Sequence, residues 1–136
     1  GLNSVIEDSL NYRAYTKRMI QVVNKLKRAF PKSSFLLMSV SDRSSNKSGR
    51  MATMNAIPAM RNAQREIAEK TEIAFWDMFE AMGGENSMVS SAQPRPPLAA
   101  KDYTHLTFNG GKKLASAMVK SLLFEHEKHE KRKPKK

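Results

Sequence analysis

The residues best suited to chemistry lie near the carboxyl end of the sequence, in the run D-Y-T-H-L-T-F-N-G-G that begins at Asp102. Asp102 stands three residues before His105, and on a tight loop its carboxylate can accept the Nδ1–H of the imidazole. The Nε2 atom is then free to take a proton from a nucleophile, because histidine titrates near neutral pH. The same spacing also occurs in loops that catalyse nothing, so on its own it predicts only an acid–imidazole pair.

Two motifs resemble sequence blocks of the SGNH (GDSL-type) serine hydrolases. The run D-Y-T-H-L-T-F-N-G-G-K-K-L-A resembles that family's last block, in which D-x-x-H supplies the acid and base of a Ser-His-Asp triad. The opening Gly1-Leu2-Asn3 resembles the G-x-N block, whose asparagine helps to form the oxyanion hole. The resemblance implies that Asp102 and His105 are catalytic and that Asn3 is an oxyanion donor. It covers essentially the whole chain, with two β/α units between the motifs.

The sequence departs from this family at its first two blocks. The G-D-S block with the nucleophilic serine, and the glycine-bearing block after it, would lie before Gly1. Serines do occur near the expected active edge, but none stands in a G-D-S or G-x-S-x-G setting; they are Ser39, Ser41, Ser44 and Ser45. The resemblance therefore implies a partner for this chain, the N-terminal half of the same domain, which supplies the serine as a separate chain or a missing segment.

The elements that must position these residues have an α/β pattern. Residues 11–30 and 55–70 carry apolar side chains at helical spacing. Residues 35–40 and 73–76 are short apolar runs, which predict parallel strands buried on both faces. Residues 43–53 are polar and are predicted to form a long loop at the carboxyl end of the first strand, the edge where open parallel sheets bind ligands.

The loop that carries the acid and the histidine lies between an irregular segment and a helix. Residues 85–101 contain three prolines and predict little regular structure. Thr107 is predicted to cap a helix that runs from about Phe108 to about His126. The residues expected to face inward from that helix are Leu114, Ala117, Met118, Ser121 and Leu122.

This pattern predicts an α/β fold, a three-layer α/β/α sandwich of the flavodoxin-like SGNH type. Only two strands are visible, and two strands buried on both faces do not make a stable sheet. We therefore expect the N-terminal strands of the sheet to be missing from this chain. Residues 1–127 are assigned to the C-terminal portion of one SGNH hydrolase domain, and residues 128–136 to a basic tail.

The composition narrows the class of partner. The 136 residues include no cysteine, so there is no disulfide framework or thiolate metal site, and no apolar run is long enough to span a bilayer. No metal or organic cofactor is predicted; His126 and His129 are interpreted as surface residues of a helix. Almost half of the net charge of +11 lies in residues 128–136, which contain six basic residues and one acidic one. Such a run is typical of a solvated chain end, so no nucleic-acid partner is predicted.

By resemblance, the complete enzyme hydrolyses an ester, removing acetyl or other short acyl groups from carbohydrate or cell-wall glycan. The resemblance to bacterial members implies a periplasmic or secreted location. One alternative is a basic module that binds anionic polymer, without catalysis, through the tail and the Lys/Arg face of the first helix. Another is a flavodoxin-like ligand-binding half-domain in which D-x-x-H is accidental.

Overall fold

The computed structural model of the chain describes residues 2–132. Gly1 of the G-x-N motif and residues 133–136 of the expected basic tail lie outside the described residues. In chain order the elements are η1 (Leu2–Ser4), α1 (Arg13–Ala29), β1 (Leu36–Met38), β2 (Ser44–Lys47), β3 (Arg50–Thr53), α2 (Ala56–Thr71), β4 (Ala74–Trp76), α3 (Met78–Met82), α4 (Ser87–Ser91) and α5 (Phe108–Arg132).

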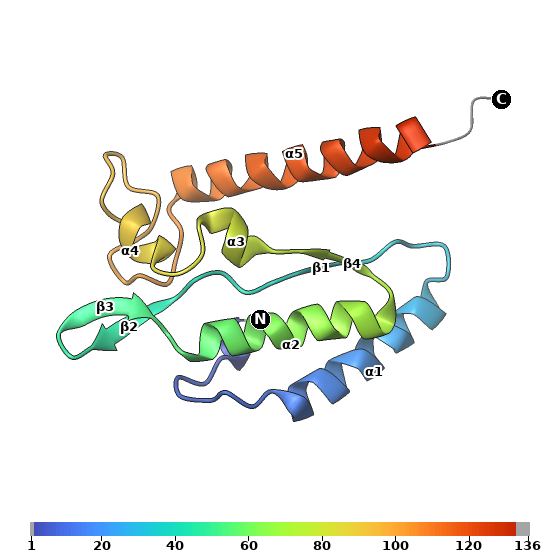
Figure 1. Cartoon of the computed structure of the whole chain (residues 1–136), viewed down its shortest axis with the longest axis horizontal. Helices are drawn as coiled ribbons and strands as arrows, with labels where there is room; N and C mark the ends of the chain where they lie inside the picture. The colour runs from blue at the N-terminus through green and yellow to red at the C-terminus, as the bar shows by residue number, and fades with distance from the viewer. Residues whose placement is uncertain (1, 133–136) are drawn as a thin grey trace.

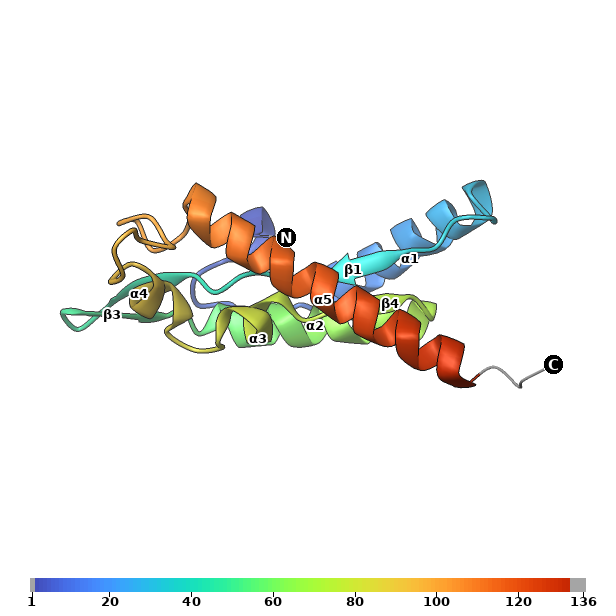
Figure 2. The ribbon, with the colours of Figure 1, turned by 90° about the horizontal axis from the view of Figure 1, so that it is seen from above.

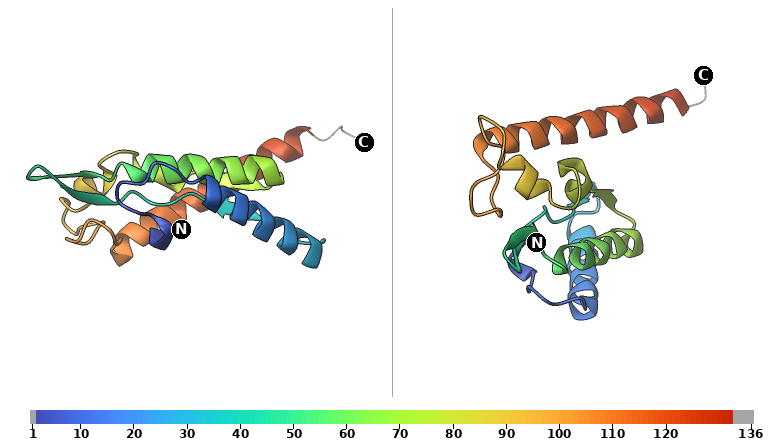
Figure 3. Two further views of the ribbon diagram at one scale, coloured as in Figure 1. Left: turned by 90° about the horizontal axis from the view of Figure 1, so that it is seen from below. Right: turned by 60° about the vertical axis from the view of Figure 1, so that its left-hand side comes forward.

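A short parallel pair of strands lies at the centre of the fold. β1 pairs with β4 in a register that sets Leu37 opposite Phe75. Helices α1 and α2 lie on one side of this pair, and α3 and α5 lie on the other (Figures 1 and 3). The predicted mixed α/β class is confirmed. The full three-layer sandwich stays a prediction, because the described central layer holds only these two strands. The domain boundary at residue 127 also stays a prediction, and α5 passes through it without a break.

The polar segment after β1 is not the loop that its composition predicted. Residues 44–53 form an antiparallel hairpin, in which β2 pairs with β3 and Lys47 lies opposite Arg50. Ser48 and Gly49 form the two-residue tip with φ angles of 52° and 85°. Both angles are in the left-handed region, as a tight hairpin turn requires. The prediction failed because neither strand contains the alternating apolar residues that usually mark a hairpin.

The expectation that β1 is buried on both faces is wrong for this chain. Leu36 and Met38 are 37% and 43% exposed, whereas Val40 just beyond the strand is buried. Leu122 of α5, predicted to face inward, is 51% exposed. Leu36, Met38 and Leu122 are therefore only partly covered by residues 2–132.

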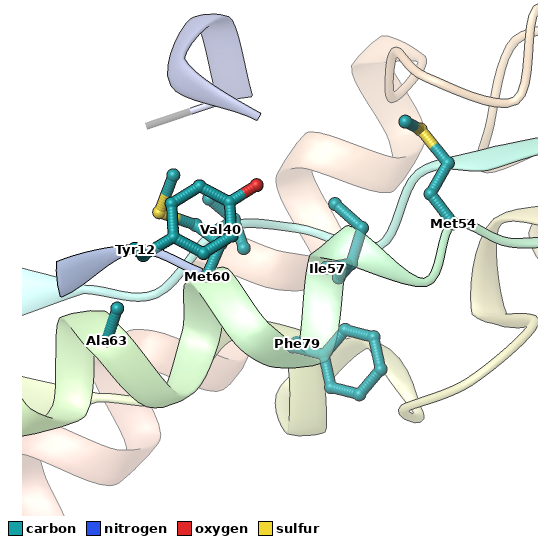
Figure 4. Packing of buried hydrophobic residues seen from close by; sticks show 7 residues of the cluster. All are labelled: Tyr12, Val40, Met54, Ile57, Met60, Ala63 and Phe79. Atoms are coloured by element: carbon teal, nitrogen blue, oxygen red, sulfur yellow. The ribbon is translucent and has the colours of Figure 1, made fainter. Parts of the chain in front are cut away.

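The hydrophobic core gathers around α2 and Val40 (Figure 4). Ile57 and Met60 of α2 are fully buried, and they pack with Val40, Tyr12 and Phe79 in one cluster. Burying apolar side chains of this size contributes about 1.5–3 kcal/mol each. The cluster therefore holds the segment between β1 and the β2–β3 hairpin against α2.

Asp77 ties this core to the end of β4. Its Oδ1 accepts a hydrogen bond from the backbone N–H of Glu80 and so caps the N-terminus of α3. Arg61 and Arg65 of α2 both form ion pairs with its Oδ2, at 2.7 and 2.6 Å. Burial acts to raise the pKa of Asp77, but the hydrogen bonds from Arg61, Glu80 and Arg65 outweigh it and lower that pKa. The carboxylate is fully used in joining α2, α3 and β4.

Candidate active site

Asp102 and His105 form a hydrogen-bonded pair on a tight loop. The Oδ2 atom of Asp102 lies 2.7 Å from Nδ1 of His105. Its Oδ1 atom accepts the backbone N–H groups of Thr104 and His105, at 2.9 and 3.0 Å. Tyr103 between them has a φ of 51°, in the left-handed region. One carboxylate thus closes the turn with one oxygen and holds the imidazole with the other.

The charge on Asp102 decides which imidazole nitrogen carries the proton. The hydrogen bond from the His105 side chain, followed by the backbone N–H groups of His105 and Thr104, lowers the pKa of Asp102 to about 2. An ionised carboxylate can only accept, so Nδ1 carries the hydrogen and Nε2 of the neutral ring has a free lone pair. The His105 side chain is 75% exposed, and Nε2 has no partner among residues 2–132. The pair can therefore accept a proton from a group that approaches from solvent.

Short-range contacts hold this loop against the start of α5. The backbone N–H of Ala100 donates to His105 O at 2.8 Å, and that of Thr107 donates to Leu98 O at 3.0 Å. Thr107 Oγ1 accepts the backbone N–H of Gly110 at 3.2 Å, which confirms the predicted cap on the last helix. His105 thus lies between a loop that is held by backbone hydrogen bonds and the capped N-terminus of α5.

Gly110 is required where α5 meets this loop. A Cβ atom at this position would overlap the carbonyl oxygen of Leu98 and lie 2.8 Å from its carbonyl carbon. In the full-length protein, Gly110→Ala should lower the free energy of unfolding by about 1–3 kcal/mol, the usual cost of overpacking. The matched control is Gly111→Ala, where a Cβ meets nothing within 4 Å and should be neutral or stabilising by up to about 1 kcal/mol. Urea unfolding of both variants provides the measurement, and equal stabilities would contradict the close contact.

The β2–β3 hairpin supports the loop from the other side. The backbone N–H of Ser44 donates to Tyr103 O at 3.0 Å. Asp42, at the root of the hairpin, is fully buried and accepts hydrogen bonds from Thr53 Oγ1 at 2.8 Å and from the backbone N–H of Met88 at 2.9 Å. Sequence reasoning did not single out Asp42. The available signal was an acidic residue two positions after the apolar run 35–40, at the edge where open parallel sheets bind ligands.

The structure does not join Asn3 to the acid–imidazole pair. Asn3 lies in η1 with an exposed side chain, and no described residue hydrogen-bonds to that side chain. Leu2 and Val5 on either side pack against the core cluster. η1 is therefore anchored, and the amide of Asn3 remains available to an outside group.

None of the chain's own serines among residues 2–132 is hydrogen-bonded to the imidazole. Ser39 Oγ is used by Asp77 and by the backbone N–H of Phe79, both at the end of β4. Ser44 Oγ is buried without a hydrogen-bond partner in the described structure. Among the described residues, the acid–imidazole pair therefore has no serine hydroxyl hydrogen-bonded to it.

The described residues offer no grouping suited to a metal ion: within 2–132, no three histidine or acidic side chains gather closely enough. His126 and His129 lie on the exposed end of α5. Over the same range, no helix combines the length and the apolar character needed to cross a bilayer.

The chain matches no protein-family model and no curated protein sequence. It is similar to a solved structure described as "Peptidoglycan O-acetylesterase in action, 5 min", with a TM-score of 0.80 and 21% sequence identity. The match covers 90% of this chain and 35% of that chain, so the chain spans about a third of the length of the esterase. At this identity the likeness concerns the fold. The chain therefore shares its fold with one part of an esterase chain.

Proposed function

We propose that this chain is the part of an SGNH-type serine esterase that carries the acid, the base and one oxyanion donor. The nucleophilic serine would come from the N-terminal half of the domain, outside this chain. The observation that carries the proposal is the 2.7 Å contact between Asp102 Oδ2 and His105 Nδ1, which leaves Nε2 open to solvent. The fold shared with part of a peptidoglycan O-acetylesterase supports it.

The proposed mechanism uses His105 twice. As the serine Oγ attacks the acyl carbonyl, Nε2 takes the serine proton and the ring becomes an imidazolium, which Asp102 stabilises. Asn3 donates to the oxyanion of the tetrahedral intermediate. His105 then gives its proton to the departing alcohol oxygen. Water attacks the acyl-enzyme with the same imidazole as base, and this step releases the acid and restores the serine.

The proposed substrate is an acetyl or other short acyl ester on carbohydrate, with cell-wall glycan as the leading case. The similar structure is described as acting on peptidoglycan. This substrate would place the protein in the periplasm or outside the cell, and the mechanism needs no cofactor.

The direct test is acetate release by the full-length protein from a small aryl acetate and from O-acetylated peptidoglycan. Both should be hydrolysed, and a serine-directed phosphonate should stop both reactions by occupying the nucleophile. Hydrolysis of the aryl acetate alone would support the triad and contradict the substrate. Absence of both reactions in a folded protein would contradict the proposed function.

The pH dependence of kcat/KM should show an acidic limb that belongs to the imidazole. The pKa of Asp102 is depressed to about 2, so its carboxylate stays ionised at every higher pH. An imidazolium cannot accept the serine proton. Activity should therefore fall at acidic pH while Asp102 is still ionised, so the acidic limb reports protonation of the imidazole. A rate that stayed constant down to pH 4 would contradict His105 as the base.

Asn3→Ala should lower kcat by about two to three orders of magnitude with little change in KM, because an oxyanion donor acts mainly in the transition state. Ser4→Ala is the matched control, since Ser4 is an exposed residue of the same short helix. Steady-state kinetics on an aryl acetate separate the two constants. A change confined to KM would contradict the assignment of Asn3 as an oxyanion donor.

A further inference from the structure

Helix α1 and the segments around it carry positive charge that no acidic residue balances. Residues 9–41 contain seven basic residues and no acidic one, a net charge of +7 in a chain whose net charge is +11. Residues 42–127 contain eleven basic and ten acidic residues and are nearly neutral. The excess charge within residues 2–127 is therefore local, and α1 carries most of it.

Most of the cations of α1 have no partner within residues 2–132. Lys27 is the exception, since its Nζ donates to Thr71 O at 2.6 Å. On α2, by contrast, all three cations are paired with the carboxylate of Asp77 or Glu66. The other five cations of α1 are exposed and form no ion pair or side-chain hydrogen bond in this part of the chain: Arg13, Lys17, Arg18, Lys25 and Arg28. These five side chains are available to a ligand.

Four of these cations lie on the side of α1 that is opposite to its buried side. Val23 is buried and marks the inner side of the helix. Successive residues of a helix are about 100° apart, so the four lie about 120–160° round α1 from Val23. From the first to the last they span about 16 Å along the helix axis. We call them the basic face of α1, which consists of Lys17, Arg18, Lys25 and Arg28.

No other element among residues 2–132 covers the basic face. Figure 3 (left), seen from below, shows α1 in front of the strand pair, and Figure 2 shows its last turns leading away from α2. The exposed apolar residues Val22 and Leu26 lie only about 60–100° from Val23, outside this arc. The other residues on the arc are small or polar, and they are Ala14, Gln21 and Ala29. The basic face is therefore hydrophilic along its whole length.

A groove between α1 and α2 borders the basic face. Its volume is about 440 Å³, and Arg13 and Lys17 line it from α1. Lys70 lines it from α2 and is already paired with Glu66 at 2.6 Å. Arg13 and Lys17 are four residues apart, the spacing at which like charges on a helix repel. An anion in the groove would remove that repulsion and would accept hydrogen bonds from both side chains.

We propose that the basic face of α1 and this groove bind peptidoglycan through the carboxylates of its peptide stems. The enzyme would thereby be held on the polymer that carries its ester. This inference rests on the proposed function for the identity of the polymer. Carboxylates spaced along a glycan match cations spaced along a helix, and arginine and lysine both form charge-assisted hydrogen bonds with them.

The residues on this face favour a hydrated polymer over a membrane or a nucleic acid. A helix that lies in a lipid surface places large apolar or aromatic side chains in the acyl layer beside its cations. Single-stranded nucleic acids are held largely by stacking of their bases on aromatic side chains. The arc of the basic face holds only Ala14, Gln21 and Ala29 besides its cations. Its charges therefore have no apolar or aromatic group beside them for either of those partners.

The proposed surface lies apart from the acid–imidazole pair. His105 precedes α5, and α5 lies across the strand pair from α1 (Figure 1). Binding at α1 should therefore leave the turnover of a small soluble ester unchanged. It should lower KM for the polymer alone, because a tethered enzyme meets the esters of that polymer at a raised effective concentration.

Co-sedimentation of the full-length protein with insoluble peptidoglycan, stripped of its O-acetyl groups, tests binding without ester chemistry. A variant with Lys17, Arg18, Lys25 and Arg28 all changed to Gln should bind about tenfold more weakly or worse, and its residual binding should depend less on salt. The matched control changes four exposed cations of α5 to Gln, with the same loss of charge: Lys120, Lys128, Lys131 and Arg132. The control should bind within about twofold of the parent, since its charges lie outside the proposed surface.

Equal binding by the parent and the α1 variant, or equal losses in the two variants, would overturn the inference. Peptidoglycan binding that stayed intact while binding to phosphatidylglycerol vesicles or duplex DNA was lost would assign the basic face to another polyanion and would also overturn it. Turnover of an aryl acetate should be the same in all three proteins, and a loss in the α1 variant alone would contradict a surface apart from the reaction. Failure of the proposed function would differ from these outcomes, because the parent itself would then hydrolyse no ester.

Discussion

His105→Ala should abolish ester hydrolysis by the full-length protein, with a loss of about four orders of magnitude or more in kcat. The imidazole is 75% exposed and contributes no packing to the core, so the variant should fold as the parent does. Loss of the base leaves the serine with a proton that nothing can accept. Turnover of an aryl acetate and the far-UV circular dichroism spectrum measure the two effects separately.

His126→Ala is the control for this experiment. His126 is also exposed, but it lies near the far end of α5 and has no carboxylate arranged as Asp102 is. It should retain parental activity. Full activity in His105→Ala would contradict a catalytic role for the acid–imidazole pair, whatever fold the complete protein has.

Asp102→Asn should lower kcat by about two to four orders of magnitude while the loop keeps its shape. The amide oxygen can still accept the backbone N–H groups of Thr104 and His105, as Oδ1 does now. The amide nitrogen would then face Nδ1 and donate to it. That arrangement moves the imidazole hydrogen to Nε2, where it blocks proton transfer from the serine.

Two measurements separate orientation from loop folding. Nitrogen-15 chemical shifts of His105 should report the Nδ1–H tautomer in the parent and the Nε2–H tautomer in Asp102→Asn. Asp102→Ala should lose activity and also speed the exchange of the Thr104 amide, since its acceptor is gone. If Asp102→Asn kept the parental tautomer and rate, Asp102 would serve only the turn.

Local features of the fold were predictable from the sequence because they depend on neighbours in the chain. The caps at Asp77 and Thr107 follow from side chains that bond to N–H groups three residues later. The contact between Asp102 and His105 has the same short range. The last helix continues beyond the predicted end at His126 to Arg132, through charged residues that favour helix and include the Glu125–Lys128 ion pair.

Features that depend on distant parts of the chain were not predictable from it. The hairpin is held by bonds to Asn86, at the start of α4, and to Tyr103 of the His105 loop. Asp42 is buried and is hydrogen-bonded by Met88, 46 residues further along the chain. The apolar run around Leu36 and the helical spacing of Leu122 predicted buried side chains, whereas both are partly exposed among the described residues. The role of Asn3 rests on resemblance alone, since no described contact joins it to His105.

The three-residue spacing of Asp102 and His105 has a consequence for how an active enzyme could be assembled from pieces. The side chains of Asp102 and His105 are oriented by one short loop and the first turn of α5. Their geometry therefore does not depend on the rest of the sheet. In the proposed enzyme, the segment that carries the serine would then have to bring a hydroxyl to an imidazole that is already oriented. A two-piece version of such an enzyme would be switched on by association itself, and the lifetime of the complex would set the duration of activity.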